Sequence, residues 1–204
     1  MTDNTDNTDN TDDTDDTKND DGYLAGQLLV AMPQMLDERF AKTVIYMCAH
    51  SEDGAMGLVV NKVMENIDFP DLLDQLGLSA PPTGEDIRVH FGGPVESGRG
   101  FVLHSADYVQ DATMVIDEAI AMTATTDILR DIAEGDGPRN SLLALGYAGW
   151  GPGQLDTEIQ ANGWLSVPAD DELVFNSDPK SVWQGALAKM GIDVSMLSGD
   201  AGHA

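Results

Sequence analysis

The stretch from Gly146 to Trp164, GYAGWGPGQLDTEIQANGW, restricts the fold of this chain more than any other segment. An apolar run at residues 141–145 precedes it and predicts a strand, and the four glycines between residues 146 and 153 predict a turn. Helical spacing follows at residues 154–161, with Leu155 and Ile159 as an apolar pair. We therefore expect a strand, a glycine-rich turn and a short helix in succession, with the turn fixing the helix against a sheet.

Most of the other apolar runs are short and predict strands. The expected strands cover residues 27–32, 43–50, 55–60, 87–91, 100–104, 114–116, 120–122, 164–167 and 173–175, although residues 120–122 could equally lead into a helix. Helices are expected at residues 69–76 and 127–134, after the caps Asp68 and Thr126, and at residues 179–190, with a helical turn at residues 35–40. Since 42% of the 204 residues are hydrophobic, the chain can bury one sizeable core.

The first 22 residues differ from the rest in composition. Residues 2–16 repeat TDN three times and TDD twice, without one apolar side chain. This pattern predicts a disordered, acidic, low-complexity tail, followed by a single globular domain at residues 23–204. A tail that binds cations or a basic partner is the alternative.

The net charge limits the possible partners. Residues 1–21 hold nine Asp against Lys18, so a charge of −18 from the total of −26 remains for residues 22–204. That part has only nine Lys and Arg with which to neutralise phosphates, and direct DNA binding is therefore disfavoured. The acidity indicates solubility, with an acidic recruiting surface as the alternative.

Cysteine content and hydropathy bear on the cellular compartment of the protein. Cys48 is alone, so neither an intramolecular disulfide nor a site with several cysteines can form. The acidic amino terminus does not fit a secretory signal, and no run of eighteen apolar residues could span a membrane. We expect a cytoplasmic location without membrane contact.

Five segments carry a resemblance to a known family. They are GQLLVAMP (26–33), DERFAKTVIYMCAHSEDGAMGLVVNK (37–62), HFGGPVESGRGFVLH (90–104), GYAGWGPGQLDTEIQANGW (146–164) and the closing GHA. In this order they resemble the YqgE/AlgH family of bacterial proteins, from about residue 22 to the end. The resemblance implies an α+β fold with a mixed, bifurcated β-sheet that forms a pseudo-barrel with flanking helices. It implies no defined activity, although one member is named for a proposed role in regulating alginate production.

Glycines and polar side chains concentrate at the expected strand ends, which predicts a ligand-binding cleft there. The candidate residues are His50, Asn61, Gly92, Gly93, Pro94, His104, Trp150, Gln154 and Glu158. The glycine-rich turn before residue 154 could cradle an anion, but GxxxxGK[ST] and GxGxxG are both missing. A G-x-S-x-G elbow is missing too. The structural alternative is that the histidines bond backbone groups and the tryptophans pack in the core.

Two catalytic arrangements of these residues are alternatives to the structural roles. His50, His104 and Glu158 could converge on a metal ion, although no ligand spacing such as HExxH supports it. Cys48 and His50 could form a thiol and its base, but a buried, inert cysteine is the simpler interpretation. We expect no cofactor and no metal.

The leading hypothesis is a non-enzymatic binding or regulatory protein that acts through a protein partner or a small ligand. The first alternative is a hydrolase or metal-dependent enzyme whose cleft is lined by the GGPV and GWGPGQ turns. The second is a structural module without any ligand.

Overall fold

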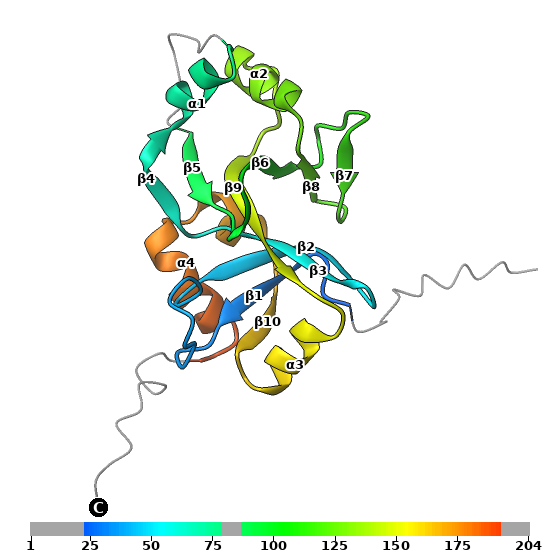
Figure 1. Cartoon of the computed structure of the whole chain (residues 1–204), viewed down its shortest axis with the longest axis vertical. Coiled ribbons are helices and arrows are strands. Elements are labelled where there is room, and N and C mark those ends of the chain that lie inside the picture. The colour runs from blue at the N-terminus through cyan, green and yellow to red at the C-terminus, as the bar shows by residue number, and fades with distance from the viewer. Residues whose placement is uncertain (1–22, 79–86, 193–204) are drawn as a thin grey trace, which may run out of the picture.

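β9 (Ser141–Trp150) joins the two parts of one β-sheet in the computed structural model, which describes residues 23–78 and 87–192 (Figure 1). Along one edge, β9 pairs antiparallel with β6 (Val95–Ser105). Its other edge is divided, because residues 143–145 pair in parallel with β5 (Arg88–Phe91) and residues 148–150 pair antiparallel with β3 (Gly54–Val59). The sheet is therefore mixed and bifurcated, as the family resemblance implied.

The first part of the sheet is an antiparallel array in the order β10 (Trp164–Pro168), β1 (Gln27–Ala31), β2 (Val44–Ser51) and β3. Side chains alternate along each strand, so Leu28 and Val30 face one core cluster and Leu29 faces another. α4 (Pro179–Lys189) contributes to the first cluster and α3 (Gln154–Gln160) to the second. This array is consequently covered by a helix on each face.

The second part contains β6, β8 (Ile120–Thr123) and β7 (Thr113–Val115), with β4 (Val63–Asp68) paired to β5. α1 (Phe69–Gln75) and α2 (Thr126–Glu134) supply its apolar cover. Phe69, Leu73 and Ile128 pack there with Leu143 and Leu145 of β9. The whole sheet is curled into a half-barrel with flanking helices, which confirms the expected α+β pseudo-barrel.

Local signals at the helix ends were largely reliable. The Asp68 side chain accepts a hydrogen bond from the Asp71 N–H at 2.8 Å, and it caps α1 as predicted. Gly135 ends α2 with a φ of 87°, a value that favours glycine. Thr126 is the first residue of α2 rather than its cap, since Thr125 takes that position without a side-chain hydrogen bond.

Three other expectations about local structure were wrong. β9 continues through Gly146 and Gly149, so the predicted turn is confined to residues 151–153. Residues 173–175 lie in a short π-helix, η1 (Glu172–Asn176), because Asp170 accepts hydrogen bonds from Leu173 N–H and Val174 N–H instead of leaving them to a strand partner. Residues 35–37 are irregular and residues 38–40 form a turn, so the expected helical turn at residues 35–40 is absent.

β4 was not expected, because its residues are mostly polar and exposed and give no apolar run. The acidic tail at residues 1–22, the loop expected at residues 79–85 and the terminal segment from residue 193 lie outside the described residues. In the part of the chain that the structure describes, each helix is too short or too polar to span a lipid bilayer.

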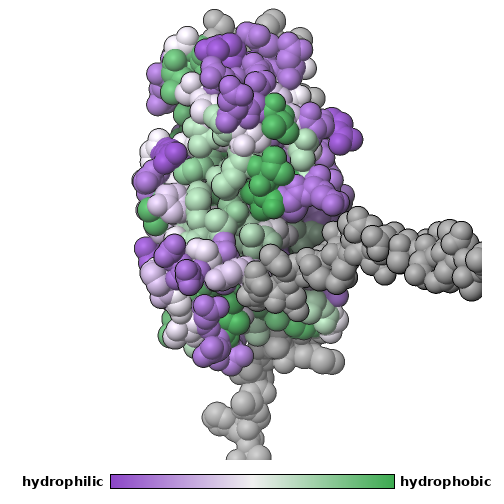
Figure 2. Space-filling model, turned by 90° about the vertical axis from the view of Figure 1, so that its right-hand side faces the viewer, coloured by the Kyte–Doolittle hydropathy of each residue, from purple (hydrophilic) through white to green (hydrophobic). Residues whose placement is uncertain are grey.

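Exposed apolar side chains gather around β7, at the end of the main strand path. Val109 and Val115 are 59% and 55% exposed, and Met114 is 39% exposed. Figure 2 shows the face of the molecule on this side, where an apolar area lies between polar regions.

Candidate functional site

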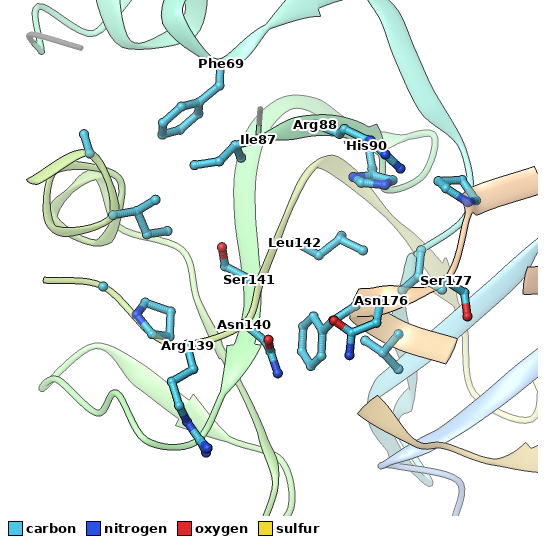
Figure 3. A pocket seen from close by; sticks show the side chains of 18 of the residues that line it. Phe69, Ile87, Arg88, His90, Arg139, Asn140, Ser141, Leu142, Asn176 and Ser177 are labelled. Carbon is cyan, nitrogen blue, oxygen red and sulfur yellow. The ribbon is translucent and has the colours of Figure 1, made fainter. Parts of the chain in front are cut away.

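A cavity of about 1070 Å³ lies between the two parts of the sheet (Figure 3). Its walls come from α1, β5, α2, the start of β9, η1 and the start of α4. Phe69, Ile87, Ile132 and Leu142 supply apolar surface. The polar residues of the lining include Arg88, His90, Asn140, Ser141, Asn176 and Ser177. Apolar walls with a few polar groups are typical of sites for small molecules.

His90 is the most deeply buried polar side chain in this lining. It is only 6% exposed, and its Nδ1 lies 3.3 Å from the Leu143 carbonyl oxygen. Since a carbonyl oxygen only accepts, Nδ1 carries the proton and donates to it. Burial lowers the pKa of His90, so the ring is neutral near pH 7 and its Nε2 is a hydrogen-bond acceptor.

The contact of Nδ1 with Leu143 is the side-chain hydrogen bond of His90 among the described residues, and it leaves Nε2 without one, although the Arg88 backbone also acts on the ring and opposes the fall in its pKa. No fully buried polar side-chain atom in residues 23–78 and 87–192 lacks a partner, so Nε2 keeps some accessible surface. Figure 3 shows the His90 ring beside Leu142, on the wall formed by β5. The cavity therefore presents a buried ring with one unused acceptor.

Arg88 lies two residues before His90 on the same strand. Residues at i and i+2 point to one face of a strand, and Figure 3 shows the two side chains side by side. The positive charge of Arg88 contributes to the lowered pKa of His90, which is consistent with their proximity. Arg88 forms no ion pair with a carboxylate of the described residues.

The lining holds three other charged side chains, Arg139, Asp178 and Glu134. Arg139 Nε donates to Asp107 Oδ2 at 3.0 Å, and Figure 3 shows its side chain pointing away from His90. Asp178 caps α4 by accepting a hydrogen bond from the Lys180 N–H at 3.1 Å. Glu134 is the last residue of α2. Arg88 is thus the cation that the cavity offers most directly.

η1 forms the wall that carries Asn176. π-helices are rare, and they occur often at functional sites because the wider turn re-aims side chains. Here Val174 and Phe175 both pack with the first core cluster and line the cavity, and Asn176 adds a polar side chain to the lining.

None of the nine residues predicted from the sequence lines this cavity. The structure brings one group of them together at α3. Glu158 Oε2 accepts hydrogen bonds from the indole N–H groups of Trp150 and Trp164 at 2.9 and 2.8 Å, and Glu158 Oε1 accepts from the Gln154 amide at 2.9 Å. The Gln154 side-chain oxygen also accepts from the Gly151 N–H at 3.1 Å. These partners fix α3 against the sheet.

His50 lies near this group but points to the chain before β1. Its Nδ1 accepts from the Leu24 N–H at 3.2 Å, and its ring packs edge-on against Tyr23. Its Nε2 is 4.0 Å from the Asp156 carboxylate. Cys48 is buried, and burial raises the pKa of its thiol to about 12, so it is not an activated nucleophile paired with His50.

A second group lies where the sheet divides. The Asn61 side chain accepts from the Val44 N–H at 2.8 Å and donates to the Lys42 carbonyl at 2.9 Å. Nearby, the Gly92 N–H donates to the Leu145 carbonyl and the Gly92 carbonyl accepts from the Val59 N–H. A Cβ atom on Gly92 would lie 2.2 Å from the Gly146 carbonyl oxygen. Gly92, Gly93 and Pro94 therefore let two backbones meet at the branch of the sheet.

His104 is separate from both groups and fully buried. Its Nδ1 lies 3.0 Å from the Ser105 carbonyl oxygen and its Nε2 lies 2.9 Å from Thr123 Oγ1. Burial lowers the pKa of His104, so the neutral ring donates through Nδ1 and accepts through Nε2. The nine predicted residues thus lie in three places in the described structure, and their role in ligand binding remains an untested prediction.

The alternative in which His50, His104 and Glu158 converge on a metal ion is not seen among the described residues. Within residues 23–78 and 87–192, no three His, Cys, Asp or Glu side chains gather closely enough to hold a metal ion. His104 and Glu158 instead satisfy Thr123 and the two tryptophans.

A family model described as AlgH-like matches residues 28–195, which is most of the chain. The chain belongs to the AlgH-like family. It is 59% identical to the UPF0301 protein of Afipia carboxidovorans, over 89% of this chain and 90% of the relative. The UPF0301 protein of Rhodospirillum rubrum is 55% identical, over 90% of this chain and 96% of the relative.

Two solved structures are similar to this AlgH-like chain. The solution structure of the AlgH protein from Pseudomonas aeruginosa has a TM-score of 0.74 and 42% identity, covering 89% of this chain and 96% of that one. The crystal structure of a Corynebacterium diphtheriae protein has a TM-score of 0.70 and 23% identity, covering 86% of this chain and 91% of that one. The second likeness shows the fold alone.

One sequence feature could have indicated the cavity of this AlgH-like chain, although the candidate residues were chosen from the glycine-rich motifs instead. Arg88 and His90 stand two apart in a segment correctly expected to be a strand, in a body with few cations. Same-face placement follows from that spacing. Asn176 and Ser177 gave no comparable signal, because a π-helix positions them.

Proposed function

We propose that this AlgH-like protein is a non-enzymatic regulatory protein of the cytoplasm that binds a small ligand in the cavity beside β5. The observation that carries the proposal is the His90 ring, which is 6% exposed, fixed through Nδ1 to Leu143, and has no partner for Nε2 among the described residues. Because Nε2 keeps some accessible surface, it is available as an acceptor to a molecule in the cavity. A ligand that donates a hydrogen bond to Nε2 would use this fixed acceptor.

The remaining lining supports a binding role. The apolar side chains from α1, α2 and β9 offer surface for the body of a small molecule, and about 1070 Å³ accommodates one of metabolite size. The polar side chains come from separate elements, including β5, β9 and η1, so their positions depend on the complete fold. A regulatory role follows if the ligand changes the interaction of those elements with a partner protein.

Chemical-shift mapping of the full chain with a library of neutral, anionic and cationic metabolites tests this proposal. We expect at least one compound to shift the amide signals of His90, Ser141 and Asn176 together. A library that shifts only signals around Gln154 and Glu158, or no signals of the described residues, would contradict a ligand site in this cavity. Chemical conversion of a bound compound during the measurement would contradict the non-enzymatic role.

A further inference from the structure

We infer that the ligand of the cavity is a small hydroxycarboxylic acid with an apolar body, an inference that rests on the proposed function. Three features of the lining define this class: a cation, an adjacent acceptor and an apolar wall. Each is supplied by described residues of the cavity.

The cation selects the anionic group. The cavity lining includes Arg88 in a protein whose net charge is −26, and Arg88 has no ion-pair partner among the described residues. An anion elsewhere on this surface meets mainly like charge, whereas a carboxylate beside Arg88 gains a planar guanidinium with which it can form two parallel hydrogen bonds. Two carboxylates of the lining oppose this: Asp178 caps α4, which partly offsets its charge, and Glu134 ends α2.

The acceptor selects a second group on the same molecule. Because Nδ1 of His90 donates to Leu143, the neutral ring offers a lone pair at Nε2 and no proton. A bare carboxylate placed there would face lone pair against lone pair. A hydroxyl group can donate to Nε2, and it must lie close to the carboxylate because Arg88 and His90 are neighbours on one strand face.

The apolar wall selects the body of the ligand. Phe69, Ile87 and Ile132 line the cavity on the side of α1 and α2, and Leu142 lies beneath the His90 ring (Figure 3). A compound with only polar groups would leave this surface wet, while an aromatic or branched aliphatic body would cover it. A volume of about 1070 Å³ leaves room for such a body.

Matched probes separate these three features in the wild-type protein. The probes are 3-phenyllactate, 3-phenylpropionate, which lacks the hydroxyl group, and 3-phenyllactamide, which lacks the charge. By titration calorimetry we expect 3-phenyllactate to bind about tenfold more tightly than 3-phenylpropionate, as one hydrogen bond to the buried His90 ring corresponds to about 1.4 kcal/mol. We expect it to bind about threefold more tightly than 3-phenyllactamide, because Arg88 is exposed to solvent. Equal binding of the three probes would overturn the inference.

Variants assign each preference to a residue. His90→Asn keeps a donor for Leu143 and removes the Nε2 acceptor, so it should bind 3-phenyllactate and 3-phenylpropionate equally. Arg88→Gln should abolish the preference for 3-phenyllactate over its amide. The control, Arg99→Gln, makes the same charge change on an exposed arginine of β6 that pairs with Glu96, and should leave both preferences intact. Preferences that survive His90→Asn and Arg88→Gln would overturn the assignment.

The same measurements distinguish the two proposals. If library compounds of another class shift the cavity signals and 3-phenyllactate does not, the hydroxy-acid inference fails and the cavity remains a ligand site. If neither the probes nor the library shift signals of His90, Ser141 or Asn176, both proposals fail.

Discussion

Glu158 on α3 and His90 on β5 are polar residues in opposite situations. Both oxygens of Glu158 accept hydrogen bonds, from two tryptophan indoles and the Gln154 amide. His90 uses one ring nitrogen for Leu143 and has no partner among the described residues for the other. Glu158, Trp150, Trp164 and Gln154 form the α3 network, in which both carboxylate oxygens of Glu158 have partners. In the cavity, by contrast, only one ring nitrogen of His90 has a partner among the described residues.

This difference shows that conspicuous glycines and tryptophans in a sequence can have a structural role. In the α3 network and at the branch of the sheet, such residues are conspicuous because close packing requires them. The cavity uses ordinary polar residues from separate strands and helices. Three changes, ordered by expected effect, test whether the branch and the α3 network are structural while the cavity is available for binding.

Gly92→Ala should have the largest effect on stability. The added Cβ atom would lie 2.2 Å from the Gly146 carbonyl oxygen, so β9 or the start of β6 would have to move. We expect the free energy of unfolding to fall by about 3 kcal/mol or more in urea denaturation. Gly98→Ala is the control, because nothing lies within 4 Å of its Cβ position; it should change stability by about 0.5 kcal/mol or less. Equal effects would refute a packing role for Gly92.

Glu158→Ala should have an intermediate effect, and only on stability. The change leaves two indole N–H groups and the Gln154 amide without their acceptor. A loss of about 2 to 3 kcal/mol in the free energy of unfolding is expected, together with altered tryptophan fluorescence. Binding of 3-phenyllactate in the folded variant should match that of the wild type. A binding defect at unchanged stability would instead restore α3 as the ligand site.

Acidification should have the smallest effect. Burial lowers the pKa of His90 and of His104 below the ordinary value of 6.5, so the unfolded chain binds protons at a higher pH than the folded one. Stability should therefore fall as the pH drops through 6.5, a window above that of Asp37, Asp107 and Asp170, whose pKa values lie below 3.8.

Urea denaturation between about pH 7.5 and about pH 5.5 measures this dependence. His90→Asn and His104→Asn should each flatten the profile, even if they lower stability at the higher pH. In the wild type, binding of 3-phenyllactate should weaken only once the pH falls through the lowered pKa of folded His90, because a protonated Nε2 no longer accepts. A flat wild-type profile would contradict neutral, buried histidines.

Much of the strand and helix pattern was predictable from the sequence. Short apolar runs predicted β1, β2 and β3, and Asp68 with Pro70 predicted the start of α1, because such signals act within a few residues. The family and its mixed, bifurcated sheet followed from five segments that are distinctive in order and composition. Part of the π-helix signal was also present, since Asp170 lies three residues before Leu173, but an apolar triplet alone favoured a strand.

The sequence by itself determined that glycines at residues 92, 93 and 146 allow a backbone turn or a close approach, and that residues 22–204 are acidic with few cations. Only the tertiary structure decided that those glycines let β9 meet its neighbours, because a close approach depends on segments some fifty residues apart. It also decided that Glu158 is satisfied while His90 is not, since hydrogen-bond partners such as Trp164 and Leu143 are assigned by folding and not by spacing along the chain.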